Sequence, residues 1–156
     1  MPLQGGFMFK HIGHVAIRAK DIEVTASFYC DMLGMKEAFR MNNGENGKLS
    51  MIYLFAAPGQ FIEIFPDGTI ERQYSPAVIG VSHFCIEVDN IEDTLEKLRA
   101  AGIPVDQELK TGASGCKMFW THDPDGNRIE FMELTPDCLH IQALNRLEQE
   151  GRLCAE

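Results

Sequence analysis

Long apolar runs are missing from this chain. None of its hydrophobic stretches approaches the ~20 residues that a membrane-spanning helix needs. The first residues also lack the basic segment and apolar stretch that make up a secretory signal. We therefore expect a cytoplasmic protein that does not enter a membrane.

Positive charge is also scarce. The 156 residues carry 14 Lys and Arg against 23 Asp and Glu, for a net charge of −9, and they contain no run of basic side chains. Proteins that bind nucleic acids neutralise phosphates with such side chains, so we expect no nucleic-acid partner. A negatively charged small-molecule substrate would need a locally positive site, which a bound metal ion can provide.

The cysteines lack the patterns of a disulfide framework or a zinc ribbon, because they are odd in number and include no C-x-x-C pair. We expect them to be small buried apolar residues, with Cys154 exposed near the end. We expect His140, in the last predicted helix, to be solvated. The five cysteines are Cys30, Cys85, Cys116, Cys138 and Cys154.

What the chain does contain is a repeat. His14 and His83 each begin a stretch of alternating apolar residues that predicts a β-strand. A predicted helix follows each stretch, over 21–34 and 90–102, and ends at a glycine, which readily adopts the left-handed backbone that closes a helix. Three short predicted strands complete each half, at 36–42, 48–56 and 60–66, and at 104–109, 115–121 and 127–134.

These patterns predict an α+β fold of two tandem βαβββ modules and a C-terminal helix. The total length is close to the ~150 residues of one domain. We place the first module at 11–67 and the second at 80–134, after an N-terminal segment of residues 1–10. Residues 135–156 hold a tail and a predicted helix that begins at Thr135.

Strand alternation puts four polar residues on one face, among large apolar side chains: His14, Glu63, His83 and Glu130. Such an arrangement costs free energy unless the four groups satisfy one another. Two imidazoles and two carboxylates could do so by sharing a divalent cation such as Ni, Co, Mn, Fe or Zn. A single strand histidine or glutamate is more often hydrogen-bonded or solvated, so spacing alone leaves both interpretations open.

The chain resembles the vicinal-oxygen-chelate superfamily over about residues 11–134, in the branch of glyoxalase I (lactoylglutathione lyase) and methylmalonyl-CoA epimerase. The resemblance implies that the two modules form a curved mixed sheet around a central metal cleft. The motifs that carry it lie at residues 14–18, 27–35, 62–64, 83–89 and 123–130.

The same resemblance implies that His14, Glu63, His83 and Glu130 bind one divalent metal per site, whose identity stays open among Ni, Co, Zn, Mn and Fe. It implies a lyase or isomerase that removes a proton next to a carbonyl through a metal-chelated enediolate. Glu130 is the first candidate for the catalytic base, and Glu63 is the second.

Substrate recognition departs from the glyoxalase pattern. Arg18 stands where glyoxalase I has an arginine for glutathione, so it is a candidate for binding a substrate carboxylate, although a surface arginine at a strand end is equally expected. Asp67 stands where glyoxalase I has an asparagine, four residues after the ligand glutamate, and its negative charge argues against glutathione.

Other functions of the superfamily stay open. The first alternative is an epimerase of an acyl-CoA or sugar-type substrate. Ferrous extradiol-type dioxygenases and fosfomycin-type thiol transferases use two histidines and one glutamate, so Glu63 as a fourth ligand argues against both. A non-catalytic bleomycin-type drug-binding protein would lack the four ligands. Family architecture implies a homodimer, with the site formed within one chain or across two.

Overall fold

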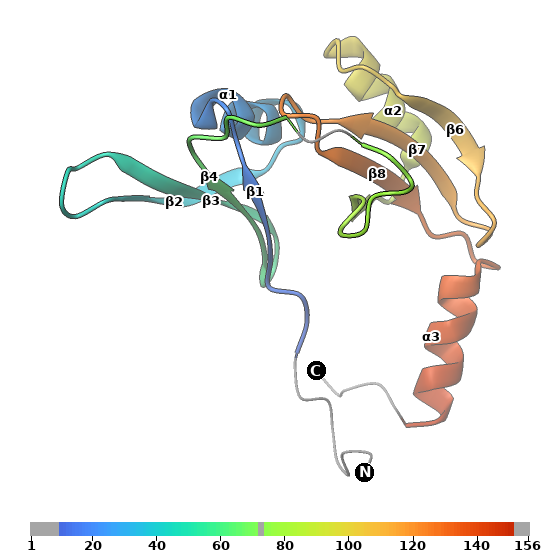
Figure 1. Ribbon diagram of the computed structural model, residues 1–156. Helices are drawn as coiled ribbons and strands as arrows, with labels where there is room; N and C mark the ends of the chain where they lie inside the picture. Colours follow the sequence, from blue (N-terminus) through green and yellow to red (C-terminus); the bar gives the residue numbers. More distant parts are fainter. Residues whose placement is uncertain (1–9, 72–73, 152–156) are drawn as a thin grey trace.

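The computed structural model describes residues 10–71 and 74–151, and its strands form two separate sheets (Figure 1). The first sheet has the order β1-β4-β3-β2 and the second has the order β5-β8-β7-β6. The strands of the first sheet are β1 (His14–Arg18), β2 (Lys36–Asn42), β3 (Leu49–Ala57) and β4 (Gln60–Phe65). Those of the second are β5 (Phe84–Glu87), β6 (Gln107–Thr111), β7 (Lys117–His122) and β8 (Arg128–Glu133).

Both sheets have the same topology. The first strand of each runs parallel to the last, β1 to β4 and β5 to β8, while the other pairs are antiparallel. A parallel pair needs a crossover, which is helical in both halves. The crossovers contain α1 (Ile22–Ser27), continued by the π-helical turn η1 (Phe28–Met32), and α2 (Ile91–Ala100). The predicted α+β fold of tandem βαβββ units is confirmed.

The core lies on the face of each sheet that strand alternation predicted. On β1 Ile17 is buried, while His14 and Arg18 on the opposite face are exposed. The same alternation buries Ile129 and Phe131 on β8. Residues of both halves belong to one hydrophobic cluster, so the two sheets are parts of a single folded unit.

The first helix departs from a regular α-helix. Asp21 caps it by accepting hydrogen bonds from two backbone N–H groups. After Ser27 the backbone widens into η1, and Tyr29 becomes fully buried. Its hydroxyl donates to Asp123 Oδ2 at 2.8 Å, so a helix of the first half contacts a loop of the second. Gly34, with a φ of +76°, follows the turn.

The Asp-Pro-Asp-Gly-Asn loop at 123–127 joins the halves through carboxylates. Besides the Tyr29 hydroxyl, Asp123 accepts hydrogen bonds from the backbone and side chain of Asn127. Asp125 accepts from the Thr25 hydroxyl and from the backbone N–H of Lys20, which flank the start of α1. These bonds fix the orientation of α1 relative to the second sheet.

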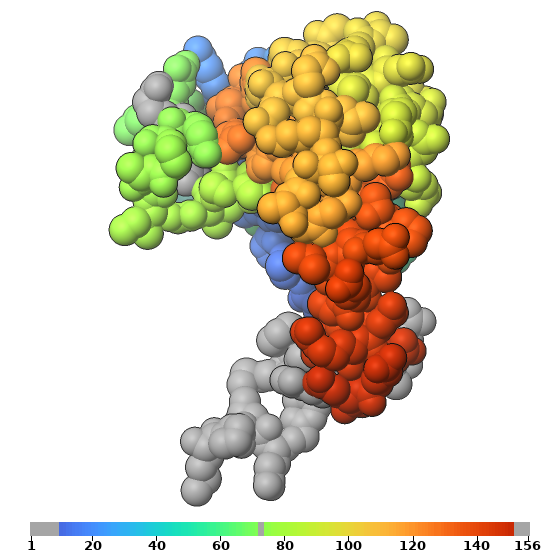
Figure 2. All heavy atoms as spheres, turned by 90° about the vertical axis from the view of Figure 1, so that its right-hand side faces the viewer, coloured from blue at the N-terminus to red at the C-terminus, as the bar shows by residue number. Residues whose placement is uncertain are grey.

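The last helix, α3 (Leu139–Gln149), begins four residues later than predicted. The Thr135 hydroxyl does not cap it, because it donates to the backbone carbonyl of Gly115 instead. No residue of α3 is buried, and Figure 2 shows the helix projecting from the body of the protein. Within residues 10–71 and 74–151, every helix falls short of the length and apolar character that spanning a bilayer requires.

Candidate metal centre

The first half of the candidate centre lies on the face of the first sheet that is turned away from the core. The parallel register sets Ala16 opposite Glu63, which brings His14 Nε2 within 3.5 Å of Glu63 Oε2. Tyr53 on β3 is the antiparallel partner of Glu63, and its ring meets the His14 imidazole edge-on. A hydrogen bond to the Glu63 carboxylate raises the pKa of Tyr53. We refer to His14 and Glu63 as the first half-site.

The second half repeats this arrangement. The register sets Cys85 opposite Glu130, and His83 Nε2 lies 3.1 Å from Glu130 Oε2. Trp120 on β7 is the antiparallel partner of Glu130, and its ring meets the His83 imidazole edge-on. On the other side of the imidazole, Ser82 Oγ lies 2.7 Å from His83 Nδ1. We refer to His83 and Glu130 as the second half-site.

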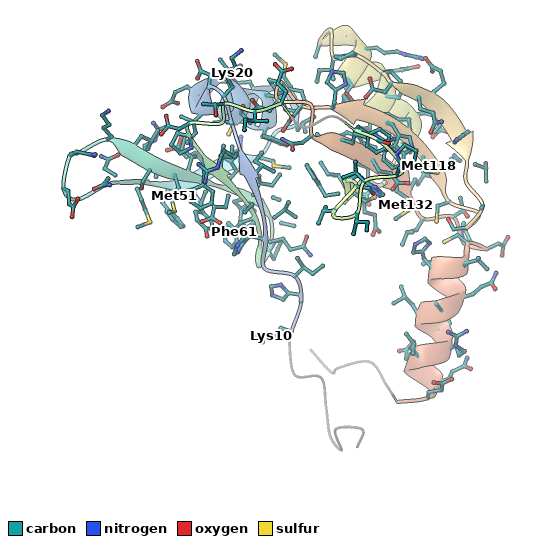
Figure 3. The ribbon with its side chains drawn as sticks, viewed as in Figure 1. Lys10, Lys20, Met51, Phe61, Met118 and Met132 are labelled. Carbon is teal, nitrogen blue, oxygen red and sulfur yellow. The ribbon has the colours of Figure 1, made fainter. Side chains whose placement is uncertain are left out.

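Both histidines, His14 and His83, line one cleft of about 910 Å³ between the sheets. The four candidate ligands nevertheless form two pairs within this chain. No three of them, among the described residues, have their ligand atoms within 4.8 Å of one another. Figure 3 labels Phe61 and Met132, each two residues from a half-site glutamate, and shows them on different sheets and apart from each other.

The chain is similar in sequence to a known protein family. The profile of the Glyoxalase/Bleomycin resistance protein/Dioxygenase superfamily matches residues 11–131. The chain belongs to this superfamily. It is 33% identical over 132 residues to the uncharacterized protein YwbC of Bacillus subtilis, a match that covers 81% of this chain and 99% of that protein.

Two further relatives of the superfamily carry glyoxalase names. The lactoylglutathione lyase of Haemophilus influenzae is 30% identical over 124 residues, covering 77% of this chain and 90% of that protein. The crystal structure of a glyoxalase family protein from Enterococcus faecalis superposes with a TM-score of 0.71 at 31% identity, covering 81% of this chain and all of that chain.

The donors of the two half-sites fit the divalent metal that this superfamily commonly uses. The side chains of Glu63 and Glu130 are only 11% and 12% exposed. In the described ranges neither carboxylate pairs with a lysine or an arginine, and each has an imidazole beside it. Largely buried carboxylates next to imidazole nitrogens are a donor set suited to a borderline divalent cation.

Two arginines near these half-sites differ in whether their guanidinium groups can bind a ligand in the cleft. Arg18, the predicted substrate-binding residue, donates to the backbone carbonyl of Pro66 at 2.8 Å and is not among the cleft residues. Arg128 does line the cleft, with its guanidinium held between the rings of Tyr74 and Trp120 at 4.0 and 4.3 Å. No carboxylate of the described residues pairs with Arg128, so its charge is available to a ligand.

Arg128 was not predicted as a site residue, although strand alternation places it on the same face as the candidate ligands. Arg128 and Glu130 are two positions apart on β8 and therefore share a face. The strand register also places Phe61 opposite His14 in the first half. The position two residues before the half-site glutamate is therefore an arginine in the second half and a phenylalanine in the first.

A separate group of potential metal ligands was also missed. Cys116, Cys138 and His140 have their ligand atoms within 4.8 Å of one another. His140 is exposed, as predicted, and its Nδ1 also lies 3.2 Å from Cys116 Sγ. The Cys-x-His spacing at 138–140 was the available signal in the sequence. The third residue of the group, Cys116, is distant in sequence and could not be found in this way.

Proposed function

We propose that this superfamily member is a metal-dependent lyase or isomerase of the lactoylglutathione lyase type. Such an enzyme removes a proton from a carbon next to a carbonyl and returns it to the neighbouring carbon. The observation that carries the proposal is the repeated histidine–glutamate pair, at matching register positions of the two sheets.

The proposed metal ligands are the two half-sites, His14 with Glu63 and His83 with Glu130. Their donor types suit Ni, Co, Zn, Mn or Fe. When bound, the divalent ion supplies positive charge that stabilises negative charge developing on the substrate oxygens. The proposed site would also make the cleft locally positive, which the net charge of −9 otherwise disfavours for an anionic substrate.

Within the proposal Glu130 moves the proton. Its carboxylate has His83 as its contact, whereas Glu63 is also hydrogen-bonded by the Tyr53 hydroxyl. A base must accept the proton and release it within one turnover, so the carboxylate with fewer partners is better suited. Arg128 would orient the substrate by binding an anionic group two residues along the same strand.

We further propose that each complete site combines the first half-site of one chain with the second half-site of a second copy. The separation of the two pairs within one chain supports this arrangement. A homodimer with twofold symmetry would then contain two equivalent sites. Each site would draw its four ligands equally from both copies.

Metal reconstitution tests the proposed activity. Metal-depleted protein is expected to convert the hemithioacetal of glutathione and a 2-oxoaldehyde only after a divalent ion is added. The measurement is initial rate against added Ni, Co, Zn or Mn, with metal content determined in parallel. Equal activity in the depleted and loaded protein would contradict the proposal. Activity confined to an acyl-CoA epimer would favour the epimerase alternative.

Complementation tests the shared site. His14→Ala damages the first half-site, Glu130→Ala damages the second, and each variant alone should be inactive. After the two variants are mixed and their subunits exchanged, half of the sites in each mixed dimer would be intact. About one quarter of wild-type activity should then return with random exchange. Subunit exchange without recovered activity would show that each site forms within one chain.

A further inference from the structure

A second cluster of ligand-type side chains lies outside the cleft, where β7 meets α3. Cys116 directly precedes β7, Cys138 is the residue before α3, and His140 is in the first turn of that helix. Both cysteines are buried, at 1% and 0% exposure, whereas His140 is exposed. Two sulfur atoms and one imidazole nitrogen therefore meet at a point that opens to solvent on one side.

Backbone contacts hold this cluster together independently of the thiols. The N–H of Leu139 donates to the carbonyl of Ser114 at 2.8 Å, and the Thr135 hydroxyl donates to the carbonyl of Gly115. Gly115 has a φ of +85°, and a Cβ at this position would lie 3.3 Å from Cys138 Cα. Only glycine fits this close approach without strain, so the turn and the helix start are fixed side by side.

The geometry suits a tetrahedral metal. Zinc binds sulfur at about 2.3 Å and nitrogen at about 2.0–2.1 Å, which sets neighbouring sulfur and nitrogen ligands about 3.5 Å apart. The observed distance from Cys116 Sγ to His140 Nδ1 is 3.2 Å. Three protein ligands and one open position are also the usual composition of an accessible zinc site.

Cysteine binds metals as the thiolate. The sulfur atoms of Cys116 and Cys138 are buried together, so a divalent cation beside them would neutralise the negative charge that both would carry as ligands.

We propose that Cys116, Cys138 and His140 form a second metal site, which binds a zinc-type divalent cation and leaves one position for water. The site is separate from the histidine–glutamate centre and does not depend on the function proposed for it. Bound metal would attach the start of α3 to the end of the second sheet. This attachment matters because α3 buries no side chain of its own.

Cobalt substitution of the reduced full chain tests the site. Thiolate ligands give cobalt an intense near-ultraviolet charge-transfer band that a site made of histidine and glutamate cannot produce. Cys116→Ser and Cys138→Ser should each abolish the band, while His140→Ala should weaken it. Cys30→Ser is the matched control, because Cys30 is a free cysteine outside the cluster. His14→Ala should leave the band unchanged whether or not the proposed function is correct.

Two results of this experiment would overturn the proposal. The first is the absence of a thiolate band after cobalt is added to the reduced wild-type protein, including the case in which Cys116 and Cys138 oxidise to a disulfide instead of binding the metal. The second is a band that survives Cys138→Ser. Metal content gives an independent reading, since loaded wild-type protein should hold about one cobalt per chain more than either cysteine variant.

Hydrogen exchange tests the attachment of α3. Zinc should slow amide exchange across α3 about tenfold in the wild-type protein and have no effect in Cys138→Ser. Amides of α2, which belongs to the core, provide the internal control and should not respond in either protein. Equal exchange of α3 with and without zinc would show that metal does not anchor the helix.

Discussion

The two half-sites have the same plan but differ in the group that is held in place. Each has a histidine, a glutamate at the same register position and an aromatic residue opposite that glutamate. In the first, the Tyr53 hydroxyl hydrogen-bonds the Glu63 carboxylate. In the second, Trp120 offers no such bond, since its buried Nε1 has no hydrogen-bond partner among the described residues.

The imidazoles show the opposite difference. His83 is fixed through Nδ1 by the Ser82 hydroxyl and lies closer to its glutamate, at 3.1 Å against 3.5 Å for His14. The first half-site therefore restrains its carboxylate, whereas the second restrains its imidazole. A restrained carboxylate suits a permanent ligand, and a less restrained one suits proton transfer. The proposed site would therefore divide its tasks, with metal binding in the first half-site and proton transfer in the second.

The largest effect is expected from replacing the half-site glutamates, which tests whether one of them is the base and the other mainly a metal ligand. Glu130→Gln removes the proposed base and should lower kcat by about 10²–10⁴-fold. Glu63→Gln should act mainly through metal affinity, so excess metal should restore much of its activity. Rates measured across a metal titration distinguish the two variants. If added metal rescued both to the same extent, the two glutamates would have equivalent roles.

The next effect concerns the arginines. Arg128→Gln removes the unpaired charge in the cleft and should raise KM for an anionic substrate about 10–100-fold, with a smaller change in kcat. Arg18→Gln is the matched control and should change KM little, because Arg18 is bonded to a backbone carbonyl. The reverse order of effects would assign substrate binding to Arg18.

A smaller effect is expected from the groups that hold each half-site. Tyr53→Phe frees the Glu63 carboxylate and should weaken metal binding about tenfold. Ser82→Ala frees the His83 ring and should weaken it by a similar factor. Competition with a coloured chelator measures both affinities. Unchanged affinity in both variants would show that neither hydroxyl positions a ligand.

The smallest effect concerns the contact between the halves. Tyr29→Phe removes the bond to Asp123 and should lower the free energy of unfolding by about 1 kcal/mol, because Asp123 keeps other donors. Burial raises the pKa of Tyr29 in the folded protein well above its usual value. The pKa of a tyrosine in the unfolded chain is about 10. The stabilisation of the folded protein by the protonated Tyr29 phenol is therefore complete below about pH 10 and is lost as the pH rises beyond it.

Denaturant titrations at several pH values check this prediction. The wild-type free energy of unfolding should fall more steeply above about pH 10 than that of Tyr29→Phe, which has no phenol to ionise at this position. Parallel pH profiles for the two proteins would show that Tyr29 does not contribute to alkaline unfolding.

Periodicity made much of the fold predictable. Alternation on β1, β4, β5 and β8 separates the apolar face that packs in or against the core from the face that carries the histidines and glutamates, and this side-chain period belongs to any strand. The start of α3 was not predictable in this way. Thr135 has the features of a helix cap, but its hydroxyl bonds to Gly115, a contact between segments distant in sequence.

The sequence by itself determined the modules, the residues of each half-site and the sharing of one face by Glu130 and Arg128, because these follow from local backbone geometry. Only the tertiary structure decided which groups meet. It paired each histidine with its own glutamate, placed Arg128 between Tyr74 and Trp120, and brought Cys116 to Cys138 and His140. Those contacts depend on packing between segments far apart in the chain, which no local pattern encodes.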